Sequence, residues 1–127
     1  MNLSDLNLLT AAPLSRPATN TATVTGSGFD LQPYEGVLKV VQEVGTVSGT
    51  TPTLDGKIQD SADNSTFADV SGLAFTEVTA SNNSQSLQVD TRSVRRYIRF
   101  VGTIGGTTPS FAMAVEIFGG KKRLGSL

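Results

Sequence analysis

Short runs in which every second side chain is apolar alternate with turn-forming residues along most of this chain. In the clearest run, Leu54 and Ile58 point to one side, and the polar side chains of Asp55, Lys57 and Gln59 point to the other. A period of two is typical of a β-strand with one buried face. The runs predict strands at residues 37–44, 52–60, 67–70, 75–78, 86–90, 94–103 and 110–118.

Seven or eight short antiparallel strands separated by turns predict an all-β fold, a single-domain β-sandwich. Two strands depart from simple alternation. In 110–118 one face is filled by Phe111, Met113, Val115 and Ile117, and Ala112 and Ala114 line the other with small side chains. We therefore expect something to pack closely against that second face. In 94–103 both faces mix apolar side chains with arginine, which indicates a central strand or an interface.

An internal repeat accompanies these strands. Residues 44–52 return as residues 101–109, with identical residues at seven of nine positions. Each copy has a β-branched run, then Gly and Thr, then a Pro that precedes the next run. This order predicts a strand, a turn and a second strand in each copy.

The ends of the chain differ from its centre. We divide the chain into an N-terminal arm and lead-in at 1–33, a sandwich at 34–120 and a basic tail at 121–127. Four leucines near the start have two interpretations: a frayed terminus, or an extended arm that docks on a neighbouring subunit. A helical turn capped by Ser4 is a further alternative for them. These leucines are Leu3, Leu6, Leu8 and Leu9.

The arm interpretation makes a prediction about deletion. Removing residues 1–17 should weaken assembly and leave the thermal unfolding of the monomer nearly unchanged. The tail carries Lys121, Lys122 and Arg123 directly after two glycines. It either clamps an acidic partner surface or is a solvated end.

Composition narrows the range of functions. The 127 residues suffice for one domain with a core, and the chain has no Cys and no His. Thiol and imidazole catalysis and the usual zinc sites are therefore excluded. A net charge of -1 gives no general attraction to nucleic acid or anionic membranes. No apolar stretch is long enough for a membrane span, so we expect a soluble protein made in the cytoplasm.

Few residue groups point to chemistry. Residues 60–66 hold oxygen ligands that calcium uses, but the spacing is not that of an EF-hand, and a hydrogen-bonded hairpin turn is favoured. No pair of carboxylates is nominated for acid–base catalysis, so we expect neither an enzyme nor a bound cofactor.

Four arginines with two aromatic residues look like a nucleic-acid surface. Strand alternation, however, places Arg95 and Arg99 with Tyr97 on one face and Arg96 on the other. Cross-strand ion pairs with acids such as Glu116 are therefore favoured over nucleic-acid binding. The group comprises Arg92, Arg95, Arg96, Arg99, Tyr97 and Phe100.

Several segments together resemble a known class of viral protein. They are residues 55–70, Asp90-Thr91-Arg92, Arg96-Tyr97-Ile98-Arg99, and the closing stretch from Thr108-Pro109-Ser110-Phe111 to Gly119-Gly120-Lys121-Lys122. They resemble the β-sandwich decoration, or cement, proteins of tailed-bacteriophage capsids. The resemblance implies a jelly-roll-like sandwich, commonly a homotrimer, that bridges major capsid proteins on the outside of the virion shell and stabilises it. Such a protein is made in the host cytoplasm.

The arm, the tail and the arginine strand are the contact regions that we expect on this interpretation. The contact residues would be Leu3, Leu6, Leu8, Leu9, Arg95, Tyr97, Arg99, Lys121, Lys122 and Arg123.

A second resemblance is to discoidin-like sandwich domains, which bind glycans or membranes through loops at one end. It rests on the turn that ends at Phe67 and on the strand Arg96-Tyr97-Ile98-Arg99. That family usually carries a tryptophan in the turn, and this chain has none, so few aromatic platforms for sugar rings are present. Carbohydrate binding and a phage tail or baseplate role are the two alternatives to capsid decoration.

Overall fold

The computed structural model describes residues 9–121, and the regular elements in this range are all strands. The predicted all-β class is confirmed: seven strands form one antiparallel hydrogen-bonded sheet. Within the described residues no helix is long and apolar enough to cross a membrane. The strands are β1 Leu9–Asn20, β2 Val24–Thr25, β3 Phe29–Asp30, β4 Tyr34–Ser61, β5 Ala68–Ala74, β6 Asn83–Asp90 and β7 Tyr97–Lys121.

Two very long strands, β4 and β7, form the centre of the molecule. They run antiparallel as one ribbon, from the pair Tyr34 and Lys121 at one end to the pair Ser61 and Tyr97 at the other. Predicted strands 37–44 and 52–60 both lie within β4, and 110–118 and most of 94–103 lie within β7. The predicted turns at the two repeats are therefore wrong, since each repeat lies in the middle of a continuous strand.

The two repeats pair with each other where the ribbon bends. Thr50 lies opposite Thr107, its counterpart in the other copy, and the register shifts on both sides of this pair. Gly49 and Gly106 have φ values of 113° and 109°. A side-chain carbon at Gly49 would lie 2.6 Å from the carbonyl oxygen of Thr108. Bulges of this kind bend a ribbon without ending its pairing.

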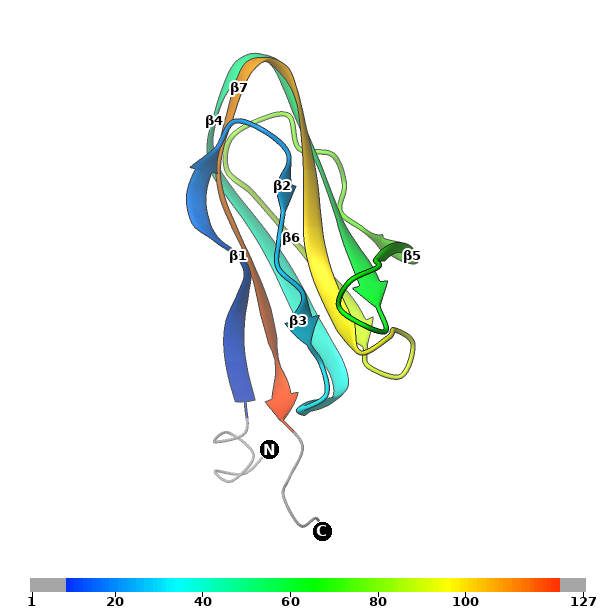
Figure 1. Cartoon of the computed structure of the whole chain (residues 1–127). Coiled ribbons are helices and arrows are strands. Elements are labelled where there is room, and N and C mark those ends of the chain that lie inside the picture. Colours follow the sequence, from blue (N-terminus) through cyan, green and yellow to red (C-terminus); the bar gives the residue numbers. More distant parts are fainter. Residues whose placement is uncertain (1–8, 122–127) are drawn as a thin grey trace.

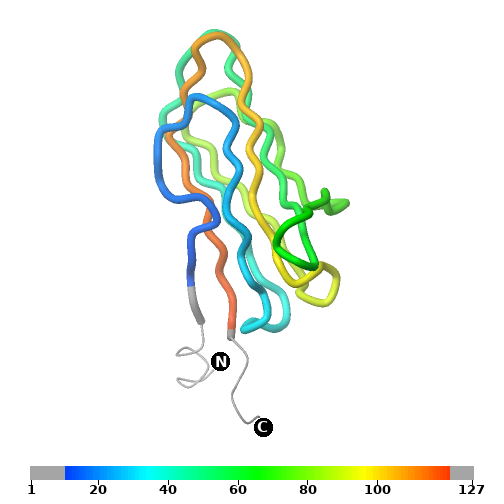
Figure 2. Tube along the Cα trace, viewed as in Figure 1, coloured from blue at the N-terminus to red at the C-terminus, as the bar shows by residue number. Residues whose placement is uncertain are grey.

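The bent ribbon folds the sheet into a sandwich of two layers (Figures 1 and 2). In the first layer, residues 110–121 of β7 lie between β1 and residues 34–48 of β4, and β6 flanks β4. In the second layer, the first half of β7 lies between β2 and β3 on one side and residues 53–61 of β4 on the other. β5 flanks β4 there.

The core lies between the layers and takes residues from both. As the alternation predicts, Leu54 and Ile58 are fully buried. β4 also buries three polar residues, Gln42, Asp60 and Ser61. Of these, Gln42 is fully buried and neither polar atom of its amide has a hydrogen-bond partner among residues 11–120. The buried apolar residues are Leu14, Leu31, Leu38, Val40, Val44, Leu54, Ile58, Phe75, Val78, Val89, Ile98, Phe100, Phe111, Met113, Val115 and Ile117.

We predicted residues 1–33 as an arm and lead-in. The described part of this segment, from residue 9, instead forms strands of the sheet. β1, β2 and β3 all pair with β7, and Leu14 and Leu31 are each only 4% exposed within the core. The cause is β7, whose outer edge in both layers is covered by this segment. Leu9 begins β1 rather than a helical turn. Leu3, Leu6 and Leu8 lie outside the described residues.

The shorter strands also differ in detail from the predictions. β5 runs to Ala74 instead of ending at residue 70, and β6 begins at Asn83 rather than 86. The predicted strand 75–78 is reduced to one isolated bridge between Leu54 and Val78. The chain pairs with β4 only briefly there, before it crosses to the first layer.

Candidate binding groove at one end of the sandwich

Two segments enclose a groove at one end of the sandwich. The turn that leads from β3 into β4 forms one wall, and the loop from β6 to β7 forms the other. The Leu31 N–H donates to the Arg96 carbonyl at 2.8 Å, and the Thr91 N–H donates to the Gly36 carbonyl at 3.0 Å. The walls are thus tied together at both ends, with a hollow of about 760 Å³ between them.

We call this hollow the arginine groove, because three arginines lie along it. Leu31, Tyr34 and Val94 supply its buried and half-buried apolar parts. The groove is lined by Leu31, Gln32, Tyr34, Glu35, Gly36, Thr91, Arg92, Val94, Arg95 and Arg96.

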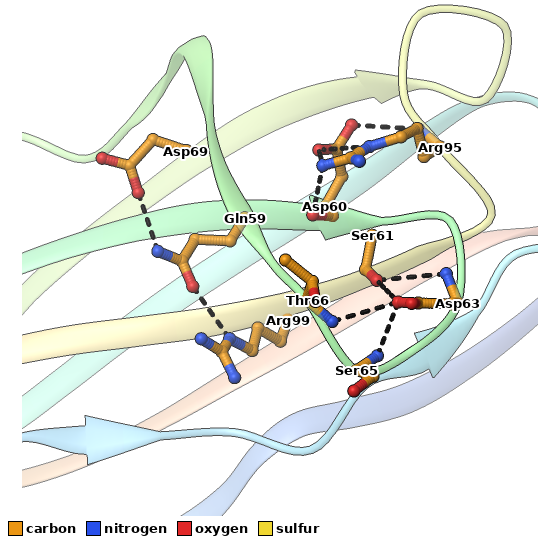
Figure 3. A network of polar contacts seen from close by, with 9 residues as sticks. All are labelled: Gln59, Asp60, Ser61, Asp63, Ser65, Thr66, Asp69, Arg95 and Arg99. Atoms are coloured by element: carbon orange, nitrogen blue, oxygen red, sulfur yellow. Dashed lines mark hydrogen bonds and ion pairs between the residues drawn. The ribbon is translucent and has the colours of Figure 1, made fainter.

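Arg95 closes the loop onto the end of β4 through Asp60 (Figure 3). Its guanidinium donates to Asp60 Oδ1 at 2.8 Å and to the Asp60 carbonyl at 2.9 Å, and its backbone N–H donates to Oδ2 at 3.0 Å. Burial raises the pKa of Asp60, but the hydrogen bonds from Arg95 outweigh burial and hold the pKa below its ordinary value. Asp60 is therefore a structural anion that fixes the position of Arg95.

The other two groove arginines also have acidic partners. Arg96 forms two hydrogen bonds to Asp30 at 3.0 and 2.9 Å, which lower the pKa of that carboxyl. Arg92 binds Asp90 at 3.2 Å, and these hydrogen bonds lower the pKa of Asp90. The Arg92 side chain is still 83% exposed. It is the cation in the groove that is most open to a partner.

The arginines do form ion pairs, but the prediction that these are cross-strand pairs is wrong: all three lie in the loop before β7, and Glu116 is not the acid in any of their pairs. Glu116 lies in the second half of β7, in the other layer of the sandwich. The face assignment also fails, because Arg95 and Arg96 precede β7, which begins at Tyr97. Alternation along a strand does not apply to residues in the loop.

Arg99 lies away from the groove, on the outer face of the second layer. It donates to Gln59 Oε1 at 2.8 Å, and its guanidinium lies 4.2 Å from the centre of the Phe67 ring. Gln59 in turn donates to Asp69 at 2.8 Å, so a polar chain crosses three strands (Figure 3). The Arg99 guanidinium is therefore engaged in contacts within the protein.

The cluster at residues 60–66 forms the turn that we favoured over a calcium site. Asp63 Oδ1 accepts hydrogen bonds from the Ser65 N–H at 2.9 Å, the Thr66 N–H at 3.0 Å and the Ser61 hydroxyl at 2.9 Å (Figure 3). These bonds lower the pKa of Asp63 to about 2. Asn64 has a φ of 61°, as such turns require. Among the described residues no group of three or more acidic side chains is placed to hold a metal ion.

The remaining predicted contact residues lie partly within the described range. Tyr97 starts β7 beside the groove, with the Arg96 guanidinium 5.0 Å from its ring centre. The backbones of Leu9 and Lys121 reach the same end, since Leu9 pairs with Gly120 and Lys121 with Tyr34. Leu3, Leu6, Leu8, Lys122 and Arg123 lie outside the described residues.

The sequence reasoning missed the acids and the apolar parts of the groove. Asp30 and Asp60 are distant in sequence from the arginines that they bind, and no local pattern connects them. Asp90 could have been found from a local pattern, because an aspartate in a turn commonly accepts a hydrogen bond from the backbone N–H two residues later. Here Asp90 Oδ1 accepts from the Arg92 N–H at 2.9 Å.

The three groove arginines are held by carboxylates outside the lining, and their exposed guanidinium edges can donate to carboxylates or backbone carbonyls of another protein. A comparison with protein-family models gives no match to this chain, and a comparison with curated proteins gives none either.

Proposed function

We propose that this protein is a structural component of a phage virion that binds the outside of the assembled capsid and bridges major capsid proteins. The observation that carries the proposal is a convergence at one end of the sandwich. Parts of the three regions expected to make contacts meet there: Arg95 and Tyr97 of the arginine strand, the start of β1 at Leu9, and the end of β7 at Lys121. Arg92, which was not among the expected contacts, lies beside them.

The groove fits a loop of a protein partner. Its walls are rigid, because backbone hydrogen bonds tie them at both ends and Asp60 fixes Arg95. A prearranged site loses little conformational entropy on binding. Apolar contact with Tyr34 and Val94, combined with donors from Arg92, is the mixture of groups typical of protein interfaces.

The mechanism is preferential binding. A protein that binds the mature lattice more tightly than free or immature subunits stabilises the mature shell by the free energy of that preference. No bond is made or broken, and no cofactor takes part. Shell stability should therefore rise with the concentration of the protein and saturate when its sites are filled.

Binding to emptied shells of its own phage tests the proposal. Arg92→Ala should weaken binding about tenfold, because an exposed guanidinium that meets the partner is lost. Arg16→Ala is the matched control, since it removes an exposed arginine from β1 rather than from the groove. Equal binding by the wild type and both variants would show that the groove is not the contact.

The same preparations test the two alternatives. Labelling of tails rather than heads in intact virions would favour the tail or baseplate role. Binding of the isolated chain to a glycan array, lost in Arg92→Ala, would favour a carbohydrate-binding module. Failure to bind shells under all conditions would overturn capsid decoration.

A further inference from the structure

The outer face of the first layer presents apolar side chains to solvent. Phe118 on β7 is 41% exposed and Val37 on β4 is 56% exposed, and these are the two exposed large hydrophobic residues of the described chain. Both point away from the core, because their neighbours Ile117 and Leu38 point inward. Apolar residues gathered on one face commonly mark an interaction surface.

The centre of this face has three rows across β4 and β7. Lys39 pairs with Phe118 in the first row, Val41 with Glu116 in the second, and Glu43 with Ala114 in the third. A hollow of about 260 Å³ runs across these rows, lined by Val41, Glu43, Ala114, Glu116 and Phe118. The exposed Phe118 ring borders it at one end, and the small side chain of Ala114 borders it at the other.

We propose that this face binds a second copy of the chain about a two-fold axis that lies between the two faces and runs along the middle row. The rotation exchanges the first and third rows. Phe118 of each copy then lies over the Ala114 end of the hollow in the other, and Lys39 lies opposite Glu43 of the other. One axis satisfies the shape and the charge together, which is the self-complementarity that a closed dimer requires.

The middle row limits the strength of the dimer. The axis brings Val41 against Val41 and Glu116 against Glu116 of the second copy. Two carboxylates that face each other repel. The dimer should therefore dissociate on dilution, and Glu116→Gln should tighten it.

This face also accounts for Ala112 and Ala114. The sequence predicts close packing against their side of the strand, and in the structure they point outward and are half-buried. A second copy supplies the packing. A two-fold contact through this face limits the assembly to a dimer, whereas the resemblance to decoration proteins implies a trimer.

Solution mass by light scattering over a dilution series tests the proposal. The wild type should change from two copies to one as it is diluted. Lys39→Glu and Glu43→Lys should each weaken dimerisation about tenfold, because like charges then face each other, and the double variant should restore it. Lys39 and Glu43 of one copy are four residues apart on an extended strand, so restoration requires contact between copies.

Controls separate this face from other surfaces. Lys57→Glu reverses a charge on β4 in the second layer and should leave the mass unchanged. Phe118→Ala should weaken the dimer and leave the thermal unfolding of the dilute monomer nearly unaffected. A mass of three copies, a single-copy mass at all concentrations, or a dimer that appears only after deletion of residues 1–8 would overturn the proposal.

The inference is independent of capsid binding. Shell binding is measured with Arg92→Ala in the groove, and dimerisation with Lys39→Glu on the outer face. A wild type that binds shells but stays a single copy would overturn the dimer alone, and one that dimerises but does not bind shells would overturn capsid decoration alone.

Discussion

Gln42 places an unpaired amide between the layers, where its inward-facing neighbours Val40 and Val44 on β4 are apolar. A buried polar group without a partner costs free energy, whereas an apolar side chain of similar length does not. Gly56 lies directly across the core, and a side-chain carbon there would overlap Gln42 Oε1, so the amide and the glycine occupy complementary space.

Gln42→Met should therefore raise the free energy of unfolding by about 1–3 kcal/mol. Methionine keeps the length and flexibility of glutamine and removes the amide. Urea unfolding measures the change, with the exposed Gln32→Met as control. A loss of stability in the core variant would mean that the amide makes hydrogen bonds in solution.

Asp63 makes a pH-dependent contribution to stability. Its pKa is lowered from 3.8 to about 2 by hydrogen bonds from the turn, so folding favours the ionised form. This contribution is fully present above the unfolded pKa of 3.8 and is lost as the pH falls through the folded pKa near 2.

Comparison of the wild type with Asp63→Ala should show this dependence. The melting temperature of the variant should be lower above pH 3.8, and the difference should shrink as the pH approaches 2. Thermal unfolding followed by circular dichroism at a series of pH values measures it. A difference that does not change with pH would show that the carboxylate charge is not what stabilises the turn.

At the scale of residues, alternation predicted burial well where a strand has one wet face. Leu54, Ile58, Phe111 and Met113 are all buried as expected. Alternation could not identify the partners of the arginines, because an ion pair such as Arg96 with Asp30 depends on how distant segments meet. The groove therefore emerges only from the folded chain.

At the scale of elements, the repeats were recognised but their structure was not. In both Gly-Thr-Thr-Pro runs the glycine and the second threonine have positive φ values, which occur in hairpin turns and in bulges alike. The two outcomes differ only in what lies across from the run. Here it is the other repeat, with Thr50 opposite Thr107, and no local pattern contains that pairing.

The symmetry of the bend predicts the behaviour of two variants. Gly49→Ala and Gly106→Ala should each destabilise the fold by about 1–3 kcal/mol and by nearly equal amounts, since each combines a positive φ with a contact of 2.6 Å to a carbonyl. Gly72→Ala is the control, because its φ is 83° and no atom lies within 4 Å of the added carbon. Urea unfolding compares the three, and unequal losses at the two repeats would contradict an equivalent role.

For the molecule as a whole, the pattern of strands along the sequence was sufficient to predict the all-β class. The segment before residue 34 was harder, because prolines and polar residues hide its strands. Pro13 and Pro17 are tolerated in β1 because it lies at the edge of the sheet, where only one side pairs, and because the register shifts near them. The composition of this segment indicated an arm outside the fold. In the structure its strands pair with β7 and belong to the sheet.

Deletion variants test this difference. Removing residues 1–17 takes away most of β1 and the buried Leu14, so it should lower the stability of the monomer strongly, in contrast to the expectation from the arm interpretation. Removing residues 1–8 keeps all of β1 and should change it little. Thermal unfolding at low concentration compares the two, and equal melting temperatures would show that β1 does not contribute to the fold.

The central position of β7 in both layers determines when the chain can fold during its synthesis. Ribosomes make the chain from the N-terminus, so β7 emerges after the other six strands. Until then β4 has only β5 and β6 as partners, and β1, β2 and β3 have none. The sandwich therefore closes after translation has passed residue 97, and its rate is set by long-range pairing, which folds slowly. The nascent chain exposes unpaired strands until that point.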